Sequence, residues 1–147
     1  MMRCDAVRQT IVDAITAITP DQKTTAGDVF QLAAQIEMVG RDRNFTVERT
    51  GPQEPANEII AGIGSGVADP YDVRFQINVY YQPTPGENAT TRLLMDGDLV
   101  VDALRGLVTD HQQIRLVDIA GVSDFDDPMG FRIARWDLVI TYDRRDS

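Results

Sequence analysis

The chain has 147 residues, 43% hydrophobic and 25% charged, a composition typical of one ordinary globular domain. Its 23 acidic and 14 basic residues give a net charge of -9, which disfavours binding to nucleic acid and anionic lipid. No apolar run approaches the roughly 18 residues of a membrane span, and charges interrupt the N-terminal segment where a signal peptide needs apolar residues. We therefore expect a protein that is intracellular at synthesis and is not held in a membrane.

The first predicted element is an amphipathic helix from Asp5 to Ile18. Apolar residues recur there at helical spacing, at Val7, Ile11, Ala14, Ile15 and Ile18. Pro20 cannot continue a helix, so it ends this one. The spacing predicts a helix that packs through one face.

Residues 29–38 fit two patterns, since their apolar residues suit either an alternating strand or one face of a helix. We favour the strand, because the turn-like residues 40–44 follow it and residues 45–48 then alternate again, as in a hairpin. Residues 50–70 hold three prolines and four glycines and are expected to form a long loop.

Val73 to Tyr81 alternate strictly between apolar and polar residues and predict a strand with one buried face. After the proline-rich stretch QPTPGENATT, either Asn88 or Thr90 is expected to cap a second helix. Its predicted buried seam is Leu93, Gly97, Val100, Leu104 and Leu107, whereas Arg92, Asp96, Asp102 and Arg105 are expected to face water. Gly97 is a poor helix former, so we expect it to mark a close approach to the sheet.

The last third of the chain predicts two strands and an acidic loop. Ile114 to Ala120 reads as a strand, and Gly121 to Gly130 (GVSDFDDPMG) as a loop. The closing strand, FRIARWDLVITYDR, changes the parity of its apolar residues, which predicts a bulge near Ala134 or Arg135. Residues 1–147 are therefore expected to form a single α+β domain, a mostly antiparallel sheet with two amphipathic helices packed on one face.

The predicted core collects the residues on the apolar stripe or parity of each element. These are Val7, Ile11, Ile15, Phe75, Ile77, Val79, Leu93, Val100, Leu104, Leu138 and Ile140.

The stretch AGIGSGVADP, residues 61–70, raises the question of a phosphate-binding loop. Its glycines are spaced GxGxG, and a strand rather than a helix follows, so it fails the dinucleotide fingerprint. There is also no GKS or GKT triplet of a P-loop. We interpret the glycines as a connection whose backbone must bend.

No other group of residues predicts catalysis, a cofactor or a metal. Asp124, Asp126 and Asp127 lack the glycine and glutamate of a calcium-binding EF-hand loop. His111 has no serine or cysteine motif nearby to activate, and Cys4 falls on the apolar side of the first helix, as a small core residue does. We therefore expect a protein that is not an enzyme.

Contacts with other subunits or partners are expected at one strand residue and two long irregular segments, residues 83–91 and 121–130. The strand residue is Tyr80, an aromatic side chain on the polar parity of its strand and so a candidate interface anchor. The other candidates are Pro83, Pro85, Glu87, Asn88, Asp124, Phe125, Asp126, Asp127 and Met129.

The order of DVRFQINVYY, a proline-rich hinge, the helix TTRLLMDGDLVVDALRGL and the closing strand FRIARWDLVITYDR resembles the tail terminator, or tail completion, proteins of long-tailed bacteriophages. The resemblance covers residues 72–144 and extends to the opening helix, residues 5–18. It rests on element order, because that family has no catalytic motif to match. Residues 22–70 have no counterpart in it.

The resemblance implies a structural virion protein assembled in the host cytoplasm. Such a subunit forms a homohexameric ring that ends the tail tube and contacts the tail tube protein and the head-tail connector or head-closure protein. DNA would pass through without specific binding, which agrees with the acidic composition. A head-closure or neck protein would look similar, and a small ligand-binding or enzymatic domain or a cytosolic adaptor are the alternatives from other classes.

Overall fold

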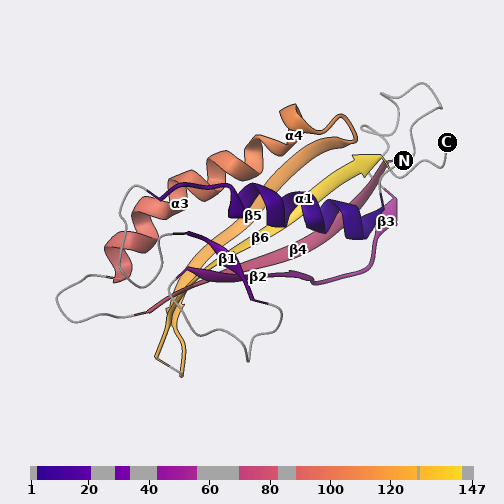
Figure 1. The fold of residues 1–147 in the computed structure, drawn as a ribbon. Helices are drawn as coiled ribbons and strands as arrows, with labels where there is room; N and C mark the ends of the chain where they lie inside the picture. The colour runs from indigo at the N-terminus through magenta and orange to yellow at the C-terminus, as the bar shows by residue number, and fades with distance from the viewer. Residues whose placement is uncertain are drawn as a thin grey trace.

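The computed structural model of the chain describes residues 3–20, 29–33, 43–55, 70–82, 89–128 and 130–143. These residues form an α+β fold in which one mostly antiparallel sheet is covered by helices (Figure 1). The strands are β1 (Gln31–Leu32), β2 (Asn44–Arg49), β3 (Glu54–Pro55), β4 (Pro70–Tyr81), β5 (Ile114–Asp126) and β6 (Arg132–Asp143). The helices are α1 (Cys4–Thr16), α3 (Ala89–Arg105) and the single turn α4 (Leu107–Asp110).

The strands lie in the order β1-β2-β4-β6-β5, with β3 also paired to β4. Long strand β4 pairs with β6 in an unbroken antiparallel register from Pro70 opposite Asp143 to Tyr81 opposite Arg132. The sheet is therefore centred on β4 and β6, and β5 forms one of its edges.

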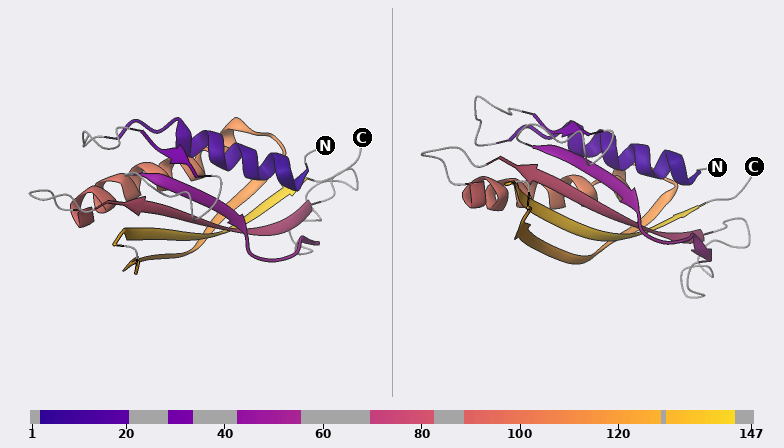
Figure 2. Two further views of the ribbon diagram at one scale, coloured as in Figure 1. Left: turned by 60° about the horizontal axis from the view of Figure 1, so that its bottom comes forward. Right: turned by 90° about the horizontal axis from the view of Figure 1, so that it is seen from below.

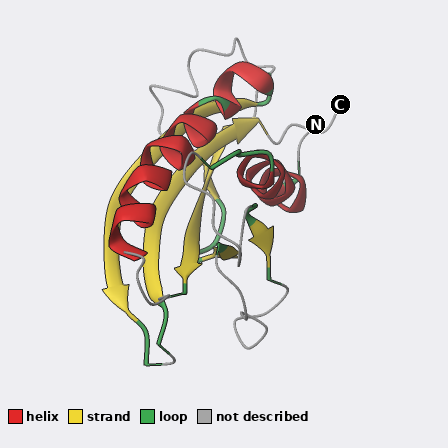
Figure 3. Ribbon diagram, turned by 60° about the vertical axis from the view of Figure 1, so that its left-hand side comes forward, coloured by secondary structure: helices red, strands yellow, loops and turns green. Residues whose placement is uncertain are grey.

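Both long helices pack on the same face of the sheet, as predicted (Figures 2 and 3). Their apolar stripes meet the inward side chains of β2, β4 and β6 in one continuous core. Every residue of the predicted core is buried there. The alternation along β4 and the helical spacing in α1 and α3 are local signals, and the core confirms them.

The predicted hairpin before β2 is wrong, because β1 pairs with β2 in parallel. Apolar alternation indicates a strand but carries no information on strand direction, which the connecting chain decides. The long loop predicted for residues 50–70 is also interrupted, since Glu54 and Pro55 pair with Asp72 and Tyr71 of β4. Residues 34–42 and 56–69, including most of the glycine-rich stretch, lie outside the described residues.

Strand β5 differs most from the prediction, because it continues through the segment Gly121–Asp126 that was expected to be an acidic loop. The segment pairs with β6 up to Asp126 opposite Arg132. Charged side chains are tolerated on an edge strand, where they point into solvent and discourage unwanted pairing.

The bulge predicted in the closing strand is found instead in β5, where the register shifts at Arg115 and again at Ala120. Strand β6 has no bulge. At one end of this strand, apolar side chains pack on both faces of the sheet. There Ile133 belongs to a second small cluster, opposite the helices, with Ala33, Tyr80, Phe125 and Phe131. The apolar residues of β6 therefore change parity because Ile133 packs on the face opposite the helices, whereas Trp136 and Leu138 pack beneath the helices.

The second helix ends earlier than its predicted seam. Gly106 separates α3 from α4, and Leu107, which belongs to α4, is buried. Thr90 lies inside α3, so it is not the cap, and Asn88 lies outside the described residues. Gly97 faces the sheet, since an added Cβ would lie 4.0 Å from Cζ2 of Trp136, but this is an ordinary contact that leaves room for a methyl group.

Candidate functional site

The free edge of the sheet is strand β5. It pairs with β6 on one side only, and no other strand of the described ranges pairs with its outer side. The opposite edge is formed by the two-residue strand β1, and beyond β1 Arg8 of α1 donates a hydrogen bond of 2.9 Å from Nε to the carbonyl of Val47 in β2. An unpaired strand edge offers backbone groups to a further strand. The two edges therefore differ in what they can bind.

A groove runs between this open edge and helix α3. We call it the α3/β5 groove, and its walls are Leu94, Gly97, Asp98 and Val101 of α3 and Val122, Ser123 and Asp124 of β5, over Ala134 and Trp136 of β6. Its volume of about 230 Å³ exceeds that of the engineered apolar cavity, roughly 150 Å³, that binds benzene. There is room in it for a side chain from another molecule.

Two large aliphatic side chains flank the groove and are mostly exposed to solvent, Leu94 by 66% and Val122 by 63%. The bulge at Ala120 sets the orientation of Val122. The one extra residue shifts the pairing of the residues that follow, so Val122 lies opposite Trp136, on the helix side of the sheet. Exposed aliphatic side chains that flank a groove are typical of a surface that another molecule covers.

Trp136, the only tryptophan of the chain, lies in the groove. Its side chain is 2% exposed, and its indole N–H has no hydrogen-bond acceptor in the part of the chain that the structure describes. The ring edge that carries Cζ2, adjacent to the N–H, faces Gly97, another residue of the groove. A buried tryptophan N–H ordinarily has a partner, so this unpaired donor is unusual.

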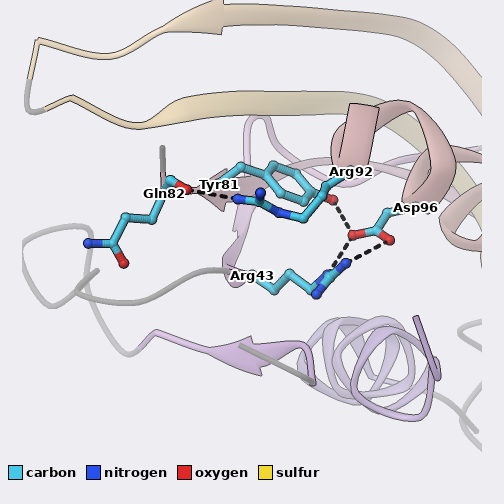
Figure 4. Close-up of polar contacts among 5 residues, drawn as sticks. All are labelled: Arg43, Tyr81, Gln82, Arg92 and Asp96. Carbon is cyan, nitrogen blue, oxygen red and sulfur yellow. Dashed lines mark hydrogen bonds and ion pairs between the residues drawn. The ribbon is translucent and has the colours of Figure 1, made fainter. Parts of the chain in front are cut away.

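A buried group of charged residues holds α3 against the sheet (Figure 4). Asp96 of α3 accepts hydrogen bonds from Arg43 Nε at 2.7 Å and from the Tyr81 hydroxyl at 2.8 Å. One turn earlier, Arg92 donates from Nη2 to the carbonyl of Gln82 at 2.7 Å. Arg43, Arg92 and Asp96 are fully buried, which corrects the expectation that Arg92 and Asp96 face water.

The position of Arg43 explains how this group is assembled. Its φ is +60°, an uncommon value for a residue other than glycine, and its backbone is held on both sides. The N–H of Arg43 donates to the carbonyl of Tyr80 at 2.8 Å, and its own carbonyl accepts from Gln31 at 3.2 Å. This fixed backbone directs the guanidinium towards Asp96. Because Asp96 precedes Gly97 directly, the ion pair also sets the position of the helical wall of the groove.

A signal for this group is present in the sequence. Arg92 and Asp96 stand on the same four-residue row of the helix as Val100 and Leu104, both fully buried. The charges of Arg92 and Asp96 suggested that they face solvent. They are buried instead, because Arg43 from a distant segment of the chain pairs with Asp96.

Beyond the second cluster, the sheet face opposite the helices carries polar side chains that pair with each other across β4 and β6. Arg135 donates to Asn78 at 2.8 Å, Gln76 to Asp137 at 3.3 Å, and Thr141 to Asp72 at 2.6 Å. Side chains that satisfy one another offer little to a partner, so this face is a weaker candidate for docking than the α3/β5 groove.

The interface residues expected from the sequence fall into separate places. Asp124 lines the α3/β5 groove, and Asp124 and Asp126 both pair with Arg132. These hydrogen bonds to two carboxylates raise the pKa of the Arg132 guanidinium. Phe125 lies on the other face, where the guanidinium of Arg135 is 4.7 Å from its ring centre. Pro83, Pro85, Glu87, Asn88 and Met129 lie outside the described residues.

Tyr80, the expected interface anchor, is 5% exposed and packs in the second cluster, with its ring edge-to-face against Phe131 at 5.9 Å. Burial raises the pKa of its hydroxyl, and the negative charge of Asp127 raises it further. Most of its surface is therefore already covered by its own chain. Asp127 lies beside it rather than in the groove.

The described residues contain no cluster of three or more metal-ligating side chains and no helix long and apolar enough to cross a membrane. Sequence comparison gives no match, either to a model of a protein family or to a curated protein.

Proposed function

We propose that this chain is a structural subunit of a bacteriophage tail, of the tail terminator type. Six copies of it would form a ring at the end of the tail tube. The ring would stop polymerisation of the tube and join the tail to the head connector. The proposal starts from the order of elements in residues 72–144. A small α+β domain with both helices on one face of the sheet supports it.

The observation that carries the proposal is the open edge of β5 beside the α3/β5 groove. The long edge strand β5 is unpaired on its outer side among the described residues, and it adjoins exposed Leu94 and Val122. Such a surface suits a protein whose task is to hold other proteins. The charged residues buried in the fold, Arg43 and Asp96, pair with each other and hold α3 in place beside the groove.

A tube-assembly experiment tests this function. Purified tail tube protein encoded beside this chain would be polymerised with and without the protein, and tube lengths and ends would be viewed by electron microscopy. We expect shorter tubes that carry a ring at one end. Tubes of unchanged length and bare ends would rule out the terminator role. A ring that binds the isolated head connector but never the tube would favour a head-closure or neck protein instead.

Light scattering of the purified protein provides an independent measurement. A mass equal to several copies supports a ring that forms in solution. A monomer at all concentrations, together with no ring on assembled tubes, contradicts the proposal, whereas a monomer that forms rings only on tubes agrees with it.

A further inference from the structure

We infer that the α3/β5 groove binds an extended, basic segment of a different protein, which adds a strand to the free edge of β5. The inference rests on the proposed function in treating the groove as an assembly surface, and it names the occupant of that surface. The occupant would place an apolar side chain between Leu94 and Val122 and lysine or arginine side chains on the flanks.

The shape of the site points to an extended segment. An unpaired strand borders the groove along one side, and a strand that pairs with it directs alternate side chains to the helix side of the sheet. Leu94 and Val122 stand on the two walls and would contact such a side chain from both directions. Trp136 lies at the base of the groove and is one of its lining residues.

The charge of the site points to a basic occupant. Asp98 and Asp124 are the charged residues that line the groove, and both are acidic. Exposed Asp102 lies one turn further along α3. Arg132 pairs with Asp124 but leaves Asp98 without a cation in any ion pair of the described residues. Lysine or arginine on the incoming segment would complement these carboxylates.

The acidic net charge of the chain disfavours a second copy of this chain as the occupant. The chain carries a net charge of -9, and most of its described arginines are held by their own chain. Arg8, Arg43, Arg92, Arg115, Arg132 and Arg135 each contact an acidic side chain, an amide or a backbone carbonyl of this chain. The other sheet edge is formed by β1, which has only two residues, and Arg8 occupies a carbonyl of β2 beyond it, so that edge offers a second copy little length for strand pairing.

Fluorescence of Trp136 tests the inference directly, because it is the only tryptophan of the chain and lies in the site. The full chain would be titrated with three short tryptophan-free peptides: alternating valine and lysine, alternating valine and glutamate, and the valine-lysine peptide with a central proline. We expect saturable binding of the valine-lysine peptide that weakens as salt rises, and slower hydrogen exchange of β5 amides. The glutamate and proline peptides should bind at least about tenfold more weakly.

Variants locate the binding site. Leu94→Ser and Val122→Thr change exposed side chains, so the fold should persist by circular dichroism, and each should weaken binding of the valine-lysine peptide about tenfold. Val108→Ser, on α4 outside the groove, is the matched control and should leave binding unchanged.

Three outcomes would overturn the inference. They are absence of binding by the valine-lysine peptide, equal binding of the glutamate peptide, and a lower assembly mass of the Leu94→Ser protein in light scattering, which would identify a second copy as the occupant. These results are separable from the test of function. A ring without peptide binding removes only the occupant, and peptide binding without a ring removes only the terminator role.

Discussion

Arg43 and Asp96 form an ion pair in which neither side chain is exposed, with Arg43 Nε 2.7 Å from Asp96 Oδ2, although 53 residues separate them along the chain. The pair connects the residue before β2 to the middle of α3. Removal of one member would leave the other as a buried charge without its main partner, which costs far more than the loss of an exposed pair.

We therefore expect Asp96→Ala to lower the free energy of unfolding by about 3–5 kcal/mol, measured by urea denaturation. Asp98→Ala, at an exposed position on the same helix, is the control and should change it by no more than about 0.5 kcal/mol. The double variant Arg43→Met/Asp96→Leu should lose less than the sum of its single variants. Strict additivity would show that the two side chains do not act as a pair.

Leu104 of α3 is fully buried against the sheet, whereas Leu94 of the same helix is mostly exposed. Leu104→Ala should lower the free energy of unfolding by about 2–5 kcal/mol, because it removes apolar contacts and leaves a cavity. Leu94→Ala should cost no more than about 0.5 kcal/mol in the same denaturation experiment. A loss below about 1 kcal/mol at Leu104 would mean that α3 packs through a different stripe.

Gly97 has room for a methyl group, since an added Cβ would lie 4.0 Å from Trp136. Gly97→Ala should raise the free energy of unfolding by about 0.5–1 kcal/mol, because alanine is the better helix former. Gly106→Ala offers a contrast, since its Cβ would meet two backbone carbonyl oxygens at 3.4 Å, and we expect no gain there. Thermal or urea denaturation measures both. Destabilisation by Gly97→Ala would show that α3 lies closer to β6.

We expect the free energy of unfolding to fall at alkaline pH because of Tyr80. Burial raises its pKa in the folded state, so between the unfolded value of about 10 and the folded value only the unfolded chain gives up the proton. The contribution of Tyr80 is fully present below pH about 10 and is lost as the pH rises towards its folded pKa. The fall in unfolding free energy from pH 8 to pH about 10.5 should be smaller in Tyr80→Phe.

The protein should not hold duplex DNA. Counterion release requires several simultaneous phosphate contacts, and the chain has 14 basic against 23 acidic residues. Of the arginine pairs 41/43 and 144/145, Arg43 is buried against Asp96, and the other three lie outside the described residues. A gel-shift titration with random duplex at low salt should show no sub-micromolar binding. Tight binding that weakens steeply with salt would mean that copies of the chain gather their arginines on one surface.

Local patterns in the sequence were sufficient for the elements whose structure depends on near neighbours. The alternation from Val73 to Tyr81 predicts β4, and the spacing of Val7, Ile11 and Ile15 predicts α1, because strand and helix periods repeat within a few residues. Since each of these patterns also states which side is apolar, the residues predicted for the core are buried, although the core also holds residues that were not predicted, such as Phe45 and Trp136.

Tertiary structure alone decided the features that depend on a distant partner. Gly121 to Asp126 form a strand because β6 provides the hydrogen bonds, although their composition is typical of a loop. Asp96 is buried because Arg43 reaches it from another segment. The α3/β5 groove depends on both, since β5 forms one wall and Asp96 positions the other. No sequence period encodes it, because a groove is a relation between elements and its geometry exists only once the sheet and helix have packed.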